Sequence, residues 1–495
     1  MTTRHRPVRR RTALLAMAST VALVISACGD GPTPGRAVTE GDIGGLPVSH
    51  FDSGLADTAP DPTIEVDNVT GGPIDTVASS AAQDVERYWH ASLPDQFGTT
   101  FEPVERLVSY DSGADDFRIC GASVQGLVNA FYCPGEDTVG WDRGALFPLL
   151  DDQFGPIGVL TVLAHEYGHV VQHRLGELAG ISAVTPTIVK ELQADCFTGN
   201  YFRRVAEGGS EFFEVSTSEG INQALSALHF VRDAPGDLRH DIDAHGTAFD
   251  RTYAFQVGFE QDPGACVEID EQAVDERTTQ YTFSDQDTRE GDLPLTEDTV
   301  ELALDSLDAA FGDIVAERPE VLTGSGGTCP DGTGTPPMSY CPGDGTDASG
   351  TVDAAIAIDI DELATLAEPI DQRAEWEGRE VEGYGDFAVF AALASRYAMG
   401  VQQAADVPLD ELGAGLRAAC YVGAWANFAN EPRARDRILR LSPGDLDEAI
   451  LEMLRQDSLI ASTVDGIPVP GGFARVEALR TGFVDGRQGC RDTAG

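Results

Sequence analysis

Apolar side chains recur at helical spacing in two neighbouring segments of the first half of the chain. Residues 160–176 read LTVLAHEYGHVVQHRLG, and Gly176 supplies a stop signal at the end of the pattern. Residues 188–202, IVKELQADCFTGNYF, continue with the same spacing. The pattern therefore predicts two consecutive helices, each with charged residues among its apolar positions.

A third helical segment, far along the chain, copies the first. Residues 392–402 read ALASRYAMGVQ, and residues 162–172 read VLAHEYGHVVQ, so that Leu, Ala, Tyr, Val and Gln fall at the same places. The second segment has Ser, Arg and Met where the first has His, Glu and His. The apolar frame of the helix is thus repeated without its reactive groups.

Further segments repeat in the same order. The pairs are SYCPGDG (339–345) with FYCPGED (131–137), LRAACYVGAWANF (416–428) with LQADCFTGNYF (192–202), and 471–490 with 245–266. Cys196 and Cys266 are each followed by another cysteine 224 positions later. A shared displacement of this size predicts the tandem duplication of one domain.

The amino terminus has the pattern of an export signal. RHRPVRRR precedes the apolar run TALLAMASTVALVISA, which is short for a membrane span and ends in small residues before Cys28. ISAC resembles the lipobox of bacterial lipoproteins, which implies lipidation of Cys28 and a position on the extracytoplasmic face of the cell membrane. An ordinary cleaved signal, and hence a secreted protein, is the alternative.

Composition changes along the chain suggest its division into parts. The segment after Cys28 is rich in Gly, Pro, Asp and Thr, which favours a tether, and a polar stretch at 285–298 separates the two halves. We expect a signal peptide at 1–27, a flexible tether at 28–80, a first folded domain at 81–275, a linker at 276–290 and a second copy of that domain, without its reactive groups, at 291–495.

The chain is strongly acidic, with 82 Asp and Glu against 33 Lys and Arg and a net charge of −49. Such a surface repels nucleic acids and anionic lipid head groups. We therefore expect no nucleic-acid partner, and contact with the membrane through the N-terminal lipid only. The sequence does not predict an oligomeric state.

The first helix carries a constellation typical of a metal site. His165 and His169 lie four residues apart, so both imidazoles project from one helix face and can bind one metal ion. In this H-E-x-x-H pattern, Glu166 is the base that takes a proton from a water bound to zinc. Two unconnected surface histidines are the alternative. We expect one Zn²⁺ per chain.

The second helix supplies the remaining groups. Glu191 would complete a His, His, Glu site and leave a fourth position open for water. Asp195, one turn further, could accept a hydrogen bond from a ligating histidine and fix its tautomer. A solvated role for Glu191 is the alternative.

Four separated motifs in one order resemble the putative neutral zinc metallopeptidase family. They are HEYGHVVQ and ELQADCFTGNYF, with FYCPGEDTVGWD (131–142) upstream and DAHGTAFDR (243–251) downstream. The resemblance covers roughly residues 84–270. It implies an α+β, zincin-like fold, in which a small sheet packs on the metal-binding helices, and it implies hydrolysis of a peptide or protein substrate.

The reaction also needs a donor for the oxyanion that forms on the attacked carbonyl. His245, in the His-Gly-Thr segment, is the first candidate, and Tyr253 and Tyr167 are weaker ones. A structural role for His245 remains open. Residues 130–142 could form an edge strand that pairs with an extended substrate.

The repeat predicts the disulfides. Without Cys28, eight cysteines remain in an oxidising compartment, and two copies of one domain should pair alike. The expected pairs are Cys120 with Cys133, Cys329 with Cys341, Cys196 with Cys266, and Cys420 with Cys490. Metal ligation by Cys196 is the alternative to its disulfide.

The losses in the second copy are grouped by function. Besides the substitutions on its first helix, it has Gly415, Ala419 and Val469 in place of Glu191, Asp195 and His245. We therefore predict a lipid-anchored zinc metallopeptidase with one active domain and one inactive copy. A zinc-stabilised scaffold without activity, or a zinc hydrolase of another amide such as cell-wall material, are the alternatives.

Overall fold

The structure is a computed structural model of the whole chain, and it describes most of the residues beyond position 41. These are residues 42–232, 246–277, 292–315, 318–343, 354–379, 381, 383–430 and 439–491. Ala37–Gly495 form one compact unit, separate from Met1–Arg36. Within the described ranges, no helix has the length and apolar character needed to cross a membrane. The signal peptide and Cys28 lie outside these ranges.

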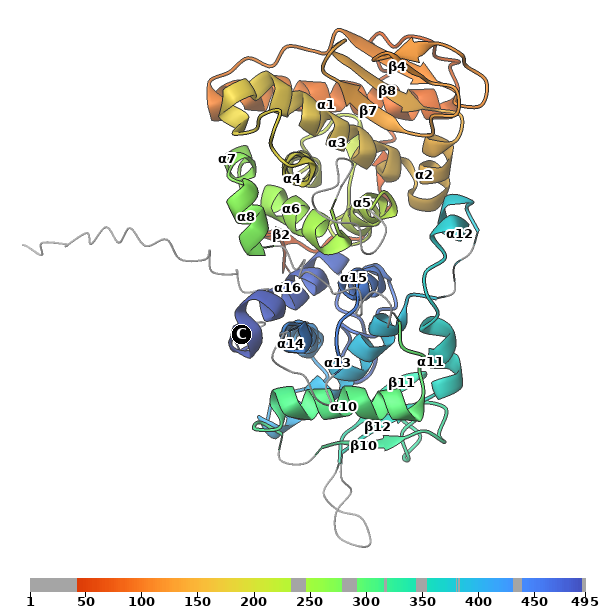
Figure 1. Cartoon of the computed structure of the whole chain (residues 1–495), viewed down its shortest axis with the longest axis vertical. Helices are drawn as coiled ribbons and strands as arrows, with labels where there is room; N and C mark the ends of the chain where they lie inside the picture. The colour runs from red at the N-terminus through yellow and green to blue at the C-terminus, as the bar shows by residue number, and fades with distance from the viewer. Residues whose placement is uncertain are drawn as a thin grey trace, which may run out of the picture. The chain divides into compact units, whose positions relative to one another are not determined.

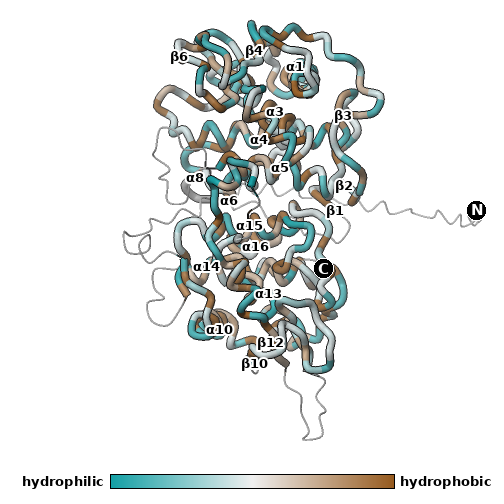
Figure 2. The backbone as a smooth tube through the Cα atoms, turned by 90° about the vertical axis from the view of Figure 1, so that its right-hand side faces the viewer, coloured by the Kyte–Doolittle hydropathy of each residue, from teal (hydrophilic) through white to brown (hydrophobic). Residues whose placement is uncertain are grey.

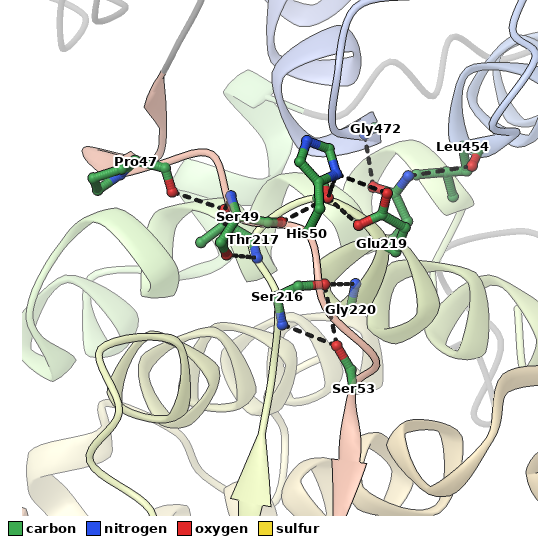
Figure 3. Close-up of polar contacts among 12 residues, drawn as sticks. Pro47, Ser49, His50, Ser53, Ser216, Thr217, Glu219, Gly220, Leu454 and Gly472 are labelled. Carbon is green, nitrogen blue, oxygen red and sulfur yellow. Dashed lines mark hydrogen bonds and ion pairs between the residues drawn. The ribbon is translucent and has the colours of Figure 1, made fainter.

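The segment before the first long helix is folded against the first half, which differs from the tether expected at 28–80. Its strands are β1 (Asp42–Ile43), β2 (Leu46–Pro47) and β3 (Gly54–Leu55), and β3 pairs with β9 (Phe213–Glu214). Figure 3 shows the hydrogen bonds of Ser49 with Thr217 and of Ser53 with Ser216, just after β9. Seryl and threonyl hydroxyls provide the contacts that a Gly- and Pro-rich segment cannot obtain from an apolar core of its own.

The first half contains a three-stranded sheet flanked by helices. After α1 (Pro73–Phe97) come β4 (Arg106–Tyr110), β5 (Arg118–Ile119), β6 (Ala122–Ser123), β7 (Ala130–Cys133) and β8 (Thr138–Asp142). The sheet order is β4-β8-β7, with β4 parallel and β7 antiparallel to β8, and β5 pairs with β6 in a separate hairpin. Only β7 of the expected strand region at 130–142 is therefore an edge, because β8 lies in the centre.

The helices of the first half follow the sheet. They are α2 (Leu146–Phe154), α3 (Pro156–Leu175), the 3₁₀ turn η1 (Gly176–Ala179), α4 (Thr187–Ala206), α5 (Glu219–Phe230), α6 (Ala248–Glu260), α7 (Pro263–Val267) and α8 (Glu271–Arg277). α3 packs against α1, α4 and β7, and α4 packs against α6 (Figure 1). The two helices expected from the apolar pattern are α3 and α4, and the mixed α+β class is confirmed.

The second half repeats this order of elements. It contains α10 (Glu297–Phe311), β10 (Glu320–Leu322), β11 (Met338–Cys341), β12 (Ala355–Ile358), α11 (Ile360–Leu366), α12 (Gln372–Trp376), α13 (Asp386–Ala404), α14 (Leu412–Asn430), α15 (Asp445–Leu454) and α16 (Gly472–Gly489). Its sheet order is β10-β12-β11, with β10 parallel and β11 antiparallel to the central strand β12. Both halves therefore have one sheet topology.

Matched close contacts and disulfides hold the helices of both halves. A Cβ on Gly258 would lie 1.8 Å from the carbonyl oxygen of Cys196, and a Cβ on Gly482 would lie 1.8 Å from that of Cys420. Only glycine permits α6 to approach α4, and α16 to approach α14, this closely. The four cysteine pairs that the structure joins are those that the repeat predicts: Cys120–Cys133, Cys196–Cys266, Cys329–Cys341 and Cys420–Cys490.

The two halves share one hydrophobic core. A continuous cluster of buried apolar residues extends from α1 to the end of α16, and apolar stretches recur along the central helices in Figure 2. Phe259 and Phe473 place their ring centroids 5.2 Å apart, and the side chain of Asn222 accepts a hydrogen bond from the Gly472 amide at 2.6 Å. The expected linker at 276–290 falls mostly outside the described residues.

Candidate metal centre

The predicted metal ligands come together where α3 crosses α4. The ligand atoms of His165, His169 and Glu191 lie within 4.8 Å of one another. The glycine between the two histidines allows this approach, because a Cβ on Gly168 would lie 2.7 Å from the Cα of Ala194. The glycine of HEYGH thus sets the distance between the two helices that carry the donors.

Each histidine turns its Nε2 atom toward the same carboxylate. The Nε2 atoms of His165 and His169 lie 3.1 and 3.4 Å from the two oxygens of Glu191. Their Nδ1 atoms are engaged elsewhere, at 2.7 Å from Asp195 and 3.0 Å from the Oε1 atom of Gln172. An Nδ1 proton held in this way leaves the Nε2 lone pair free for a metal.

The three side chains fit zinc in number and in chemistry. Two imidazoles and one carboxylate are a typical donor set for catalytic zinc, and they leave a coordination position open. Burial alone would lower the pKa of His165, but Asp195 and Glu191 raise it to about 10 in the ion-free protein. The same carboxylates favour a cation at this position, so a metal ion would replace the proton.

Asp195 belongs to a buried ionic pair that sequence reasoning did not predict. Arg251 on α6 donates from Nε to one oxygen of Asp195 at 2.8 Å and from a terminal nitrogen to the other at 2.9 Å. Both side chains are almost fully buried. Burial opposes ionisation of Asp195, but Arg251 and His165 hold its pKa below the usual value. Arg251 therefore keeps Asp195 charged and fixed beneath His165.

Glu166 lies between the metal ligands and the edge strand. Its Oε2 atom accepts a hydrogen bond from the backbone amide of Tyr132 on β7 at 2.9 Å. Burial raises the pKa of Glu166, against the lowering effect of His165 and His169. A carboxylate with a raised pKa beside a metal centre suits proton transfer near neutral pH.

These groups line one cavity. Its polar wall consists of the three candidate ligands, Glu166 and Arg251, and its other walls come from β7, α2, α5 and the second half. The apolar side chains from α2, from α5 and its end, and from the second half are Leu146, Leu228, Val231 and Trp376. Trp376 lies 185 positions after Glu191 and more than 200 after the two histidines, so local spacing carries no signal for it.

The remaining predicted residues have different outcomes. His245 lies outside the described residues, so its role stays a prediction. The hydroxyl of Tyr167 donates to Glu86 at 3.1 Å, and the Arg480 guanidinium lies 4.5 Å from the ring centroid of Tyr253. Neither tyrosine is among the residues that line the cavity. The disulfide of Cys196 excludes its role as a thiolate ligand.

Comparison with known proteins places the first half in a family. The family model described as "Putative neutral zinc metallopeptidase" matches residues 72–269, which include every candidate ligand. Proteins described as uncharacterized, from Mycobacterium bovis and from two strains of Mycobacterium tuberculosis, are 32% identical over 208 residues. The match covers 38% of this chain and 68% of each relative.

The chain belongs to this family. No solved structure gives a significant match to the chain. The family name implies zinc and a hydrolase, in agreement with the donor set at the crossing of α3 and α4. The family match ends before the second half begins.

In the second half, Arg396 and Met399 stand at the positions that the sequence repeat aligns with Glu166 and His169. Arg396 is buried on α13, where it donates to the backbone oxygen of Met338 and to the hydroxyl of Ser462, both at 3.2 Å. Met399 is buried one turn further. Burial lowers the pKa of Arg396 to about 10. Residues 246–495 contain no histidine, so this half lacks the imidazoles of the first.

Proposed function

We propose that the protein is a zinc metallopeptidase with one zinc ion per chain, whose active centre lies in the first half. The observation that carries this proposal is the placement of Glu166 beside two imidazole Nε2 atoms and a carboxylate, with both Nδ1 atoms engaged. A purely structural zinc site needs neither an open position nor an adjacent base.

The residues of this chain have distinct roles in that reaction. Bound zinc would polarise a peptide carbonyl and lower the pKa of a water molecule towards ~7. Glu166 accepts the proton of this water and delivers it to the leaving amine. Asp195 and Gln172 orient the two imidazoles, and Arg251 keeps Asp195 ionised.

The edge strand offers a place for the substrate backbone. Among the described strands β7 has a neighbour on one side only, so an extended peptide could add to its other side. The amide of Tyr132 already bonds to Glu166. Substrate pairing and the position of the base would therefore depend on the same strand.

We further propose that the second half is an inactive duplicate of the first, and that the protein is exported and held at the membrane by lipid on Cys28. The common sheet topology, the matched disulfides and the matched glycine contacts support the duplication. The basic and apolar pattern of residues 1–27 supports export. His245 remains the candidate oxyanion donor.

Metal analysis combined with a Glu166→Gln variant tests the proposed function. The exported protein should contain one zinc per chain and cleave an unfolded protein or a peptide library. Glu166→Gln should retain the zinc while its hydrolysis rate falls by about 10²- to 10⁴-fold, the usual contribution of a general base. Exposed Glu177 on η1 offers a matched control, and Glu177→Gln should remain active.

Three outcomes would contradict the assignment. They are full activity in Glu166→Gln, two zinc ions per chain, and loss of zinc in Glu166→Gln. A wild-type protein that cleaves a cell-wall amide but no peptide would keep the mechanism and change the substrate. A zinc-loaded protein inactive on both would favour a scaffold.

A further inference from the structure

A short segment of the second half reaches the cavity of the first half. α12 (Gln372–Trp376) lies between α11 and α13 in sequence, yet its contacts are with α2 and α5 (Figure 1). The side chain of Gln153 on α2 donates to the backbone oxygen of Glu375 at 3.0 Å. α12 is therefore fixed to the first half through its backbone as well as its side chains.

An ionic contact strengthens this attachment. A terminal nitrogen of Arg232, just after α5, lies 3.4 Å from a carboxylate oxygen of Glu375. The Arg232 side chain is only 4% exposed, and the same guanidinium donates to the backbone oxygen of His229 at 2.9 Å. Because the contact is largely shielded from water, it is weakened less by salt than a surface pair.

This attachment sets the position of Trp376. Its ring lies 4.6 Å from the ring of Phe230, centroid to centroid and tilted by 44°. Trp376 remains 43% exposed, and it lines the same cavity as His165 and Glu166. A large indole held on one face by an aromatic neighbour and open on the other resembles a binding wall more than a core residue.

The cavity that Trp376 lines has both charged and apolar residues. The metal-binding groups and Glu166 provide its charged wall, whereas Leu146, Leu228 and Val231 lie with Trp376 among its apolar residues. A substrate whose scissile bond reaches the charged wall would place a neighbouring side chain against the apolar one. Burial of an apolar side chain there would add binding free energy, and a polar side chain would lose its hydration.

We propose that Trp376, supplied by the second half, forms a wall of the substrate subsite and selects peptides with a bulky apolar side chain beside the scissile bond. This inference rests on the proposed peptidase function. It gives the second half a role in substrate selection that requires no metal centre of its own.

Two peptides that differ at one position test the proposal. They would carry Phe or Asn beside the bond that the wild-type protein cleaves, and kcat/KM would be measured for both. The wild type should prefer Phe, and Trp376→Ala should reduce the ratio of the two kcat/KM values about tenfold or more, as expected for loss of an apolar contact. Trp376→Phe should retain most of the preference.

Controls separate this effect from a loss of structure. Val484 on α16 is 58% exposed and does not line the cavity, so Val484→Ala should leave the ratio unchanged. Trp376→Ala should keep the zinc content of the wild type and remain folded at the assay temperature, because the contacts of Glu375 still attach α12 to the first half.

The possible failures are distinguishable. An active wild type whose Phe-to-Asn ratio is unchanged by Trp376→Ala would refute the role of Trp376 and leave the peptidase function intact. Equal losses on both peptides would also refute it, since they indicate a general defect. A zinc-loaded wild type that cleaves no peptide would refute the peptidase function and this inference together.

Discussion

Replacement of Asp195 by Asn should damage both folding and zinc binding, because one buried carboxylate serves both. Asp195 has no exposed surface, and Arg251 is 1% exposed. Asn keeps the shape and one acceptor oxygen but removes the negative charge that Arg251 contacts with two of its nitrogens. Breaking a buried pair from one side typically costs about 3–5 kcal/mol.

The effect on zinc can be separated from the effect on folding. The Nδ1 atom of His165 would lose its anionic acceptor at 2.7 Å. Loss of such a partner usually reduces metal affinity about 10- to 100-fold, which corresponds to about 1.4–2.7 kcal/mol. The imidazole would remain in place but would be a weaker and less fixed ligand.

Two measurements test this prediction. Urea unfolding of the metal-free protein gives the change in the free energy of unfolding. Tryptophan fluorescence can report the transition, because Trp89 and Trp141 lie in the core of the first half. Competition with a chromophoric chelator gives the zinc affinity. Asp67→Asn is the control, because Asp67 pairs with Arg106 on the surface and should cost no more than about 1 kcal/mol.

A small effect would refute the reasoning. If Asp195→Asn loses less than about 1 kcal/mol of stability and binds zinc as tightly as the wild type, the pair with Arg251 does not hold the site. A loss of stability with unchanged zinc affinity would restrict Asp195 to a structural role.

Two further predictions concern other parts of the fold. The pKa of Glu448 is raised to about 10, first by burial and then by the negative charges of Asp445 and Asp386, with a smaller effect of Asp292. Since the folded-state pKa lies above the unfolded one, stability falls as pH rises between them. Glu448→Gln should thus increase the melting temperature at pH 8 but not at pH 4, whereas a decrease at pH 8 would indicate a bound cation. Gly258→Ala should lower the free energy of unfolding in urea by more than about 3 kcal/mol, because the added Cβ would force α4 and α6 apart. A loss under about 1 kcal/mol would contradict the close contact.

Sequence spacing addresses the local part of the candidate metal centre. His165 and His169 share one face of a helix because their spacing is four, and this relation does not depend on tertiary structure. Arg251 was not assigned to the site, because its contact with Asp195 depends on how α6 packs against α4. Gln172 was missed although it lies three residues after His169 on α3, a spacing that already brings the two side chains together. A signal was present, however, since Arg475 and Gln402 occupy the matching positions of the repeat.

The amino-terminal segment shows where composition is a poor guide. A segment rich in Gly, Pro and Thr cannot form its own core, which favoured a tether at 28–80. Residues 42–72 pack nonetheless, because the hydroxyl of Thr217 accepts from the Ser49 amide and donates to the Pro47 oxygen (Figure 3). Composition excludes an independent domain but not attachment to a neighbouring one.

The second half has a buried arginine at the position that the repeat aligns with Arg251, but it lacks the carboxylate that pairs with it. Arg475 matches Arg251, but Ala419 stands where the first half has Asp195. The Arg475 guanidinium therefore donates to backbone oxygens, among them those of Val469 and Met453. Hydrogen bonds to carbonyl groups satisfy its donors but do not neutralise its charge.

The compensating charge comes from a different helix. Glu452 on α15 is buried, and its charge favours the protonated forms of both Arg475 and Arg396. The hydroxyl of Ser458 donates to Glu452 at 2.8 Å. Glu452 therefore acts electrostatically on two buried guanidinium groups, and one of them, Arg396, stands at the position that the repeat aligns with Glu166. Arg475 is present in a half that has no histidine ligand to orient. We therefore infer that the role common to Arg251 and Arg475 is to hold helices together. In the first half, Arg251 has the additional effect of fixing Asp195, which in turn bonds to His165.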